Sequence, residues 1–113
     1  MTLGDVVWID LQIGGGRAQS GRRPAIVFQS SEIPGAKLPT VLVVPLTSQQ
    51  AAMRFPGTAL ISPNATNGLR QPSVALVFQL TAVDLNFVSN PIGQVSASQI
   101  EELMQALDEL LGQ

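Results

Sequence analysis

Short apolar segments bounded by glycine or proline fill most of this chain, and they limit the folds that it can adopt. The segments are rich in β-branched and aromatic residues, which is typical of β-strands. Clusters of glycine, proline and asparagine between them mark turns. Strands are expected at residues 5–11, 24–28, 40–47, 58–61, 73–79 and 91–94. The strand that begins at residue 73 could extend as far as residue 83. Single helical turns are expected within 49–54 and 84–90, a loop at 30–39 and an exposed loop at 62–68.

One amphipathic helix is expected at the end of the chain. Its apolar residues recur at spacings of three and four, which is the pattern of one buried helix face. Two pairs fit a capping box at its start, Ser96 with Gln99 and Ser98 with Glu101. The residues expected to face the core are Ile100, Leu103, Met104, Leu107 and Leu111. Short strands followed by one helix predict a β-rich fold, a barrel of five to seven strands with a helix laid against it.

Length and composition predict a soluble, folded protein. The 113 residues suit one domain, and we expect no second domain, linker or internal repeat. The hydrophobic fraction of 45% and the charged fraction of 12% are typical of globular proteins. No apolar run approaches the roughly 20 residues that span a bilayer. The first residues lack the pattern of a signal peptide, so we expect a cytoplasmic protein that does not contact a membrane.

The absence of cysteine and histidine narrows the chemistry further. It excludes thiol catalysis, disulfides, the common zinc sites and any imidazole base. The eight acidic residues form no cluster with the spacing of metal ligands, so we expect neither a metal nor another cofactor. Four of these acids lie in the last thirteen residues. Before residue 100 there are six basic residues and four acidic ones. The body is therefore mildly basic and the C-terminal helix is acidic.

Two adjacent arginines precede the second expected strand. Pro24 fixes its own φ and favours an extended conformation at Arg23. Alternation along a strand sends Arg22 and Arg23 to opposite faces, and Arg23, which adjoins the buried run, is the better candidate for an anion-binding group. The glycines at 14–16 lack the context of a phosphate loop and predict an ordinary loop that could close over a ligand.

A second candidate position follows the third strand. Pro45 cannot donate a backbone hydrogen bond, so we expect a bend there, with pairing lost at Leu46, Thr47 and Ser48. Taken alone, the hydroxyls of Thr47 and Ser48 more often satisfy nearby backbone groups. By the same reasoning Arg54 and Arg70 are solvated surface residues, and Trp8 belongs to the core rather than to a platform for stacked bases.

Together these segments resemble the MazF/PemK toxin family, in order and spacing and over essentially the whole chain. The resemblance is carried by residues 4–11, 19–27, 40–48, 55–58, 73–79 and 92–96 together with the final helix. It implies one toxin domain over residues 1–113, an SH3-like barrel with a C-terminal helix, and a homodimer. It also implies a metal-independent, sequence-specific endoribonuclease of a type II toxin–antitoxin system. Such an enzyme cleaves single-stranded mRNA, leaves a 2′,3′-cyclic phosphate and a 5′-hydroxyl, and binds a cognate antitoxin protein.

The resemblance assigns the catalytic arginine to Arg23 and the catalytic threonine to Thr47. A fixed guanidinium can stabilise the charge that develops on the phosphoryl oxygens, and a threonine hydroxyl can donate to one of them. A guanidinium keeps its proton at neutral pH and is a poor general base, so its role would be electrostatic and proton-donating. The residues expected to bind RNA are Arg17, Gln19, Arg22, Ser48, Arg54, Arg70 and Gln79.

Three positions depart from the family pattern. Ala18 stands where a glutamate often occurs, Phe78 replaces an acidic residue before Gln79, and Thr81 replaces an arginine. A carboxylate base is therefore missing from two plausible places, and no residue is assigned as the general base. We also expect the C-terminal segment of an antitoxin to lie across residues 17–23 and block the site.

Two other functions are compatible with the same fold. One is a toxin that poisons DNA gyrase by binding it through the C-terminal helix. This mode would not require the arginine loop. The chain also has no aromatic residue near its C-terminus that could anchor such binding. The other is a silenced member of the family that binds RNA or an antitoxin without cleaving.

Overall fold

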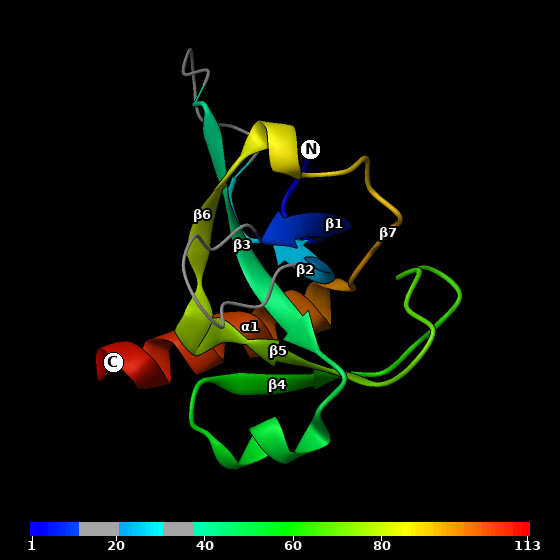
Figure 1. Cartoon of the computed structure of the whole chain (residues 1–113). Helices are drawn as coiled ribbons and strands as arrows, with labels where there is room; N and C mark the ends of the chain where they lie inside the picture. Colours follow the sequence, from blue (N-terminus) through cyan, green and yellow to red (C-terminus); the bar gives the residue numbers. More distant parts are fainter. Residues whose placement is uncertain (12–20, 31–37) are drawn as a thin grey trace.

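The structure is a computed structural model, and it describes residues 1–11, 21–30 and 38–113 (Figure 1). The expectations for the glycines at 14–16 and for most of the loop at 30–39 lie outside these residues. The strands are β1 (Asp5–Leu11), β2 (Gly21–Val27), β3 (Thr40–Thr47), β4 (Thr58–Ile61), β5 (Ser73–Leu76), β6 (Thr81–Asp84) and β7 (Gly93–Gln94). The helices are α1 (Ala97–Leu111) and the short 3₁₀ turns η1 (Gln50–Arg54), η2 (Val77–Gln79) and η3 (Leu85–Phe87).

The strands form one curled antiparallel sheet. Its order is β4-β5-β3-β2-β1-β7, and β6 pairs with the upper part of β3. Helix α1 packs against β4 and η2, behind the sheet in the view of Figure 1. The predicted β-rich class with a C-terminal helix is therefore confirmed. Among the described residues, no helix combines the length and the apolar character needed to cross a membrane.

Strand β3 is shared by two parts of the sheet. It pairs with β2 over Val43–Pro45, and Ala25 and Pro45 form the last pair of that ladder. On its other edge it pairs first with β6 and then, at Leu46 and Thr47, with β5. The expected bend at Pro45 thus appears as a loss of pairing to β2. The expected loss of all pairing at residues 46 and 47 is wrong, because β5 supplies a partner on the opposite edge.

Two buried clusters occupy the two faces of the sheet. One lies between the sheet and α1 and includes Ile26, Val44, Leu46, Ile61 and Leu103. The other is smaller, and it is formed largely by the alternate residues of β1, β2 and β3, Val7, Ile9, Ala25, Val27, Val41 and Val43, with Val83 of β6. Alternation along the strands therefore separates the residues that face the helix from those that face away from it.

Several element boundaries differ from the expectations. Strand β2 begins at Gly21 rather than at Pro24, because β1 pairs with it as far as residue 11. Arg22 and Arg23 therefore both belong to the strand. Strand β5 ends at Leu76, where η2 interrupts the expected run before β6 begins at Thr81.

The helix begins with the Ser96–Gln99 capping box and ends at Gly112 in a left-handed conformation. Its buried residues are Leu103 and Ala106, whereas Met104 and Leu111 are 48% and 62% exposed. The expected core positions at 104 and 111 are wrong, because the face against β4 and η2 is centred on residues 103 and 106.

Candidate functional site

Arg23 and Thr47 lie on neighbouring strands, each two residues beyond the last pair of the β2–β3 ladder. An even step along a strand keeps a side chain on the same face, so both share the face of Ala25 and Pro45. Both are half-buried. Among the described residues, no hydrogen bond or ion pair engages the guanidinium of Arg23. The two candidates for phosphate chemistry therefore flank the point where β2 and β3 separate.

The hydroxyl oxygen of Thr47 is engaged by a backbone group. Its Oγ1 accepts a hydrogen bond from the backbone N–H of Gln49, at 3.2 Å. The backbone of Thr47 is held from the other side by its pairing with Val74 of β5. With its oxygen already accepting, the hydroxyl group can turn its own hydrogen toward a ligand oxygen.

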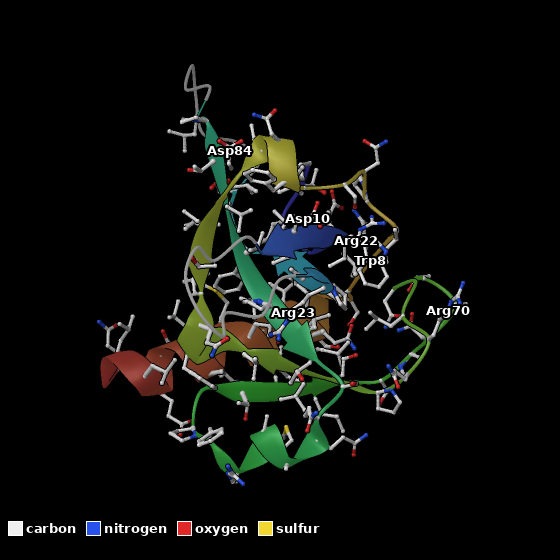
Figure 2. All side chains as sticks on the ribbon, in the orientation of Figure 1. Trp8, Asp10, Arg22, Arg23, Arg70 and Asp84 are labelled. Carbon is white, nitrogen blue, oxygen red and sulfur yellow. The ribbon has the colours of Figure 1, made fainter. Side chains whose placement is uncertain are left out.

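Arg22 points to the opposite face from Arg23, as alternation predicts. Its guanidinium carbon lies 5.5 Å from the centroid of the Trp8 ring, which is a cation–π contact. Figure 2 shows Arg22 and Trp8 together, with Arg23 apart from them near the middle of the sheet. Trp8 is only half-buried, so the expectation that it belongs to the core is wrong. Its ring is part of a surface that a ligand can reach.

A cavity of about 450 Å³ begins beside this surface. Trp8 and Pro24 line it from β1 and β2, and Ser48 lines it from the end of β3. The opposite wall is the segment 68–71, which includes Arg70. Pro24 and Ser48 are the chain neighbours of Arg23 and Thr47, so the cavity starts next to the two candidates for phosphate chemistry. A second cavity, of about 270 Å³, is lined by Trp8, Asp10, Arg22 and residues 86–89.

The wall at residues 68–71 is held by two asparagines. The Asn67 side chain is fully buried; its Oδ1 accepts from the backbone N–H of Asn64 and Leu69, and its Nδ2 donates to the carbonyl of Ser62. Asn64 Oδ1 in turn accepts from the backbone N–H of Thr66 and Asn67. The expected exposed loop at 62–68 is therefore wrong at residue 67. The Asn-x-x-Asn spacing was a signal for this side-chain network, which sequence reasoning missed.

Glycines at 68 and 93 allow this loop to approach the end of the sheet. Gly68 has a φ of 72°, and a side chain there would meet the carbonyl oxygen of Ile92. A side chain at Gly93 would meet the backbone of Thr66 and Asn67. The backbone N–H of Gln94 donates to the carbonyl of Thr66 at 2.9 Å. The cavity wall is thus fixed to β7 as well as to its own turn.

Arg54 and Gln79 belong to a different surface. The Arg54 guanidinium lies 4.8 Å from the Phe55 ring centroid, and Phe55 meets Phe78, the neighbour of Gln79, edge to face at 5.7 Å. None of these four residues lines either cavity beside Trp8. Of the expected RNA-binding residues, the structure gathers Arg22, Ser48 and Arg70 around these cavities. Arg17 and Gln19, with Ala18, lie outside the described residues.

A buried carboxylate, Asp5, lies away from this surface and has a structural role. Burial raises the pKa of Asp5, but hydrogen bonds from the backbone of Thr2, from Gln94 and from the Thr2 hydroxyl, together with the positive N-terminus, lower it more. The net effect is a pKa below the ordinary value of 3.8. Asp5 thereby links the start of β1 to β7, and it is already engaged rather than available as a base.

Comparisons with known proteins agree with the fold and cover nearly the whole chain. The family model of the PemK-like, MazF-like toxin of type II toxin–antitoxin system matches residues 2–111. Endoribonuclease MazF6 of Mycobacterium tuberculosis is 29% identical over 107 residues, which are 95% of this chain and 93% of that protein. Endoribonuclease MazF of Staphylococcus saprophyticus is 30% identical over 113 residues, 99% of this chain and 92% of that protein.

A solved structure has the same fold. One chain of the MazE–MazF crystal structure from Deinococcus radiodurans superposes with a TM-score of 0.74 at 24% identity, over 99% of this chain and 96% of that chain. The family model, the 30% identical relative and the shared fold agree. The chain therefore belongs to the PemK-like, MazF-like toxins of type II toxin–antitoxin systems.

Proposed function

We propose that the chain is an endoribonuclease toxin that cleaves single-stranded RNA without a metal ion, and that the toxin domain spans residues 1–113. The names of the relatives, endoribonucleases MazF6 and MazF, support the reaction class. The single observation in this chain that carries the proposal is the position of Arg23 and Thr47 beside the separation of β2 and β3. The cut RNA would lie across the sheet at this point, with its phosphate between the two strands.

In the proposed reaction the RNA supplies its own nucleophile. The ribose 2′-oxygen loses its proton and attacks the adjacent phosphorus, and the bond to the 5′-oxygen of the next nucleotide breaks. The products are a 2′,3′-cyclic phosphate and a 5′-hydroxyl, whose oxygen takes up a proton. Arg23 would stabilise the charge on the phosphoryl oxygens and donate toward the leaving oxygen, and Thr47 would donate its hydroxyl hydrogen to a phosphoryl oxygen. Loss of one such donor typically slows an enzyme by about 100- to 1,000-fold.

The test is digestion of a long mixed-sequence RNA by the purified protein in EDTA. We expect site-specific fragments whose 5′ ends carry a hydroxyl, and we expect Arg23→Ala to lose them while keeping its thermal unfolding transition. A matched control is Glu101→Gln, a change of charge on the exposed part of α1. Intact RNA with well-folded wild-type protein would overturn the proposal.

The partners follow from the same assignment. Membership of a toxin–antitoxin family supports binding to an antitoxin protein, and one chain of the MazE–MazF crystal structure shares this fold. We propose that the toxin acts as a homodimer in the cytoplasm, where mRNA is available, and that an acidic C-terminal segment of the antitoxin lies across residues 17–23 and blocks the site. A change in sedimentation on mixing with the antitoxin would test the partnership.

A further inference from the structure

We propose that Trp8 and the cavity beside it bind one unstacked base of the RNA, in the nucleotide next to the cut phosphate. The inference rests on the proposed function, since the base belongs to the strand that Arg23 and Thr47 would cleave. It adds a base-binding subsite on the opposite face of β2, lined by the chain neighbours of Arg23 and Thr47.

Trp8 borders two cavities. Among the described lining residues, Trp8 is common to the cavity of about 450 Å³ and to the cavity of about 270 Å³. Arg22 lines the smaller cavity but not the larger one. Its contact with the indole therefore lies on the side of the smaller cavity, and Arg22 is not among the described residues that line the larger one. An aromatic ring supported by a guanidinium on one side is a suitable surface for stacking a base on the other.

The larger cavity has the composition of a base-binding pocket. Its volume lies within the range of sites that hold small ligands, roughly 300–1,000 Å³. Besides Trp8 it is lined by apolar groups and by a few polar side chains, namely Ser48, Arg70, Gln71 and Ser73. The Ser48 hydroxyl, the Gln71 amide and the Arg70 guanidinium can donate to the oxygen and nitrogen atoms at a base edge, and the amide can also accept from an amino group. Ser73 already donates its hydroxyl hydrogen to the carbonyl of Gln71 and offers only its oxygen as an acceptor. None of the described residues that line this cavity is acidic, which suits a ligand that carries phosphates.

The position of the cavity assigns the base to a neighbour of the cut phosphate. Pro24 and Ser48 line the cavity, and they directly follow Arg23 and Thr47 in the chain. In Figure 2, Arg70 lies on the loop that faces Trp8 across this region. A strand whose phosphate contacts Arg23 and Thr47 could then turn an adjacent base over the edge of β2 into the cavity. Single-stranded RNA is commonly recognised by such splayed bases.

The far wall of the cavity is preformed. The Asn67 and Asn64 side chains hold the turn before it, and the carbonyl of Thr66 is bonded to β7. On the near side, the backbone of Trp8 is fixed by two hydrogen bonds with Ser89, one to its Oγ and one from its N–H, each at 2.9 Å. A preformed pocket loses little conformational entropy on binding, which favours discrimination between bases.

The chain has a built-in reporter for this inference, because Trp8 is its one tryptophan. The first experiment titrates wild-type protein with fully 2′-O-methylated RNA nonamers of mixed sequence, which lack the nucleophilic hydroxyl and cannot be cut. We expect a saturable loss of Trp8 emission, because a base stacked on the indole quenches it. Cleavage of unmodified RNA by the same protein is measured in parallel and tests the proposed function separately.

The second experiment uses variants and reads the cut sites of a long RNA. Trp8→Leu removes the aromatic surface, and we expect kcat/KM at preferred sites to fall about tenfold, with a weaker base preference beside the cut. Trp8→Phe keeps a ring and should restore most of both. The matched control is Phe55→Leu, since Phe55 also lies beneath an arginine but lines neither cavity, and its profile of cut sites should match that of wild type.

Each result decides between the proposals. Cleavage by wild type without any change in Trp8 emission overturns the subsite and leaves the nuclease standing. Saturable quenching without cleavage supports the subsite and overturns the nuclease. Quenching by an acidic antitoxin peptide, with none by any RNA, would assign this surface to a protein partner and overturn the subsite. An unchanged cut-site profile in a folded Trp8→Leu variant would also overturn it.

Discussion

Ala25 of β2 and Pro45 of β3 form the last backbone pair between their strands, and the strands separate immediately beyond it. Arg23 and Thr47 lie beyond this last pair, one on each of the two strands. Proline has no N–H to donate, so residue 45 could add no donor of its own to a longer ladder. The backbone of β3 continues along β5 instead, which holds Thr47 in an extended conformation.

Thr47→Val should lower the rate of RNA cleavage about 10- to 100-fold, because valine keeps the shape of threonine but cannot donate to a phosphoryl oxygen. Thr47→Ser keeps the hydroxyl and should retain most of the activity. The measurement is the initial rate of cleavage of one RNA under saturating and subsaturating conditions. If Thr47→Val cleaves as fast as Thr47→Ser, Thr47 has no part in the reaction.

Reversal of the charges before the second strand should weaken antitoxin binding. An acidic antitoxin segment across residues 17–23 would be attracted by the positive charges of Arg17 and Arg22. Arg17→Glu and Arg22→Glu should therefore each raise the Kd for the antitoxin, with a smaller effect at high salt. Isothermal titration at two salt concentrations measures this. The matched control is Arg54→Glu on the surface of Phe55 and Phe78. If all three variants bind the antitoxin as tightly as wild type does, the antitoxin binds elsewhere.

Asn67→Ala should lower the free energy of unfolding by about 2–3 kcal/mol, because it leaves buried N–H and C=O groups of the turn without partners. Chemical denaturation measures the change. Asn90→Ala is the control, since Asn90 is exposed, and its effect should stay within about 0.5 kcal/mol. A small effect at residue 67 would mean that water replaces the side chain in the turn.

Asp5→Asn should remove part of the acid sensitivity of the fold. The pKa of Asp5 is lower in the folded chain than its ordinary value of 3.8, so the ionised carboxylate stabilises the fold fully above that pH. This contribution is lost as the pH falls through the lower folded pKa. In Asp5→Asn the free energy of unfolding should be lower at neutral pH and should change less in acid. Asp108→Asn on the exposed face of α1 should keep the wild-type slope.

The sequence predicted the elements better than their boundaries and environments. The turn residues and the alternating apolar runs predicted most strands, the C-terminal helix and the opposite directions of Arg22 and Arg23. The end of β5 was not predicted, because Val77 and Phe78 have strand propensity and tertiary contacts impose η2 on them. The burial of Asn67 and the exposure of Trp8 depend on partners distant in the chain, Gly93 and Arg22 among them, which local patterns do not specify.

The shared strand β3 gives the two halves of the sheet a mechanical connection. Thr47 is held by the β4–β5 part, which also packs against α1, whereas Arg23 is held by the β1–β2 part. The relative position of these two side chains therefore depends on β3, which pairs with both parts. Helix α1 is thereby connected to Thr47 through β4 and β5, and β3 joins this part of the sheet to the strand that carries Arg23.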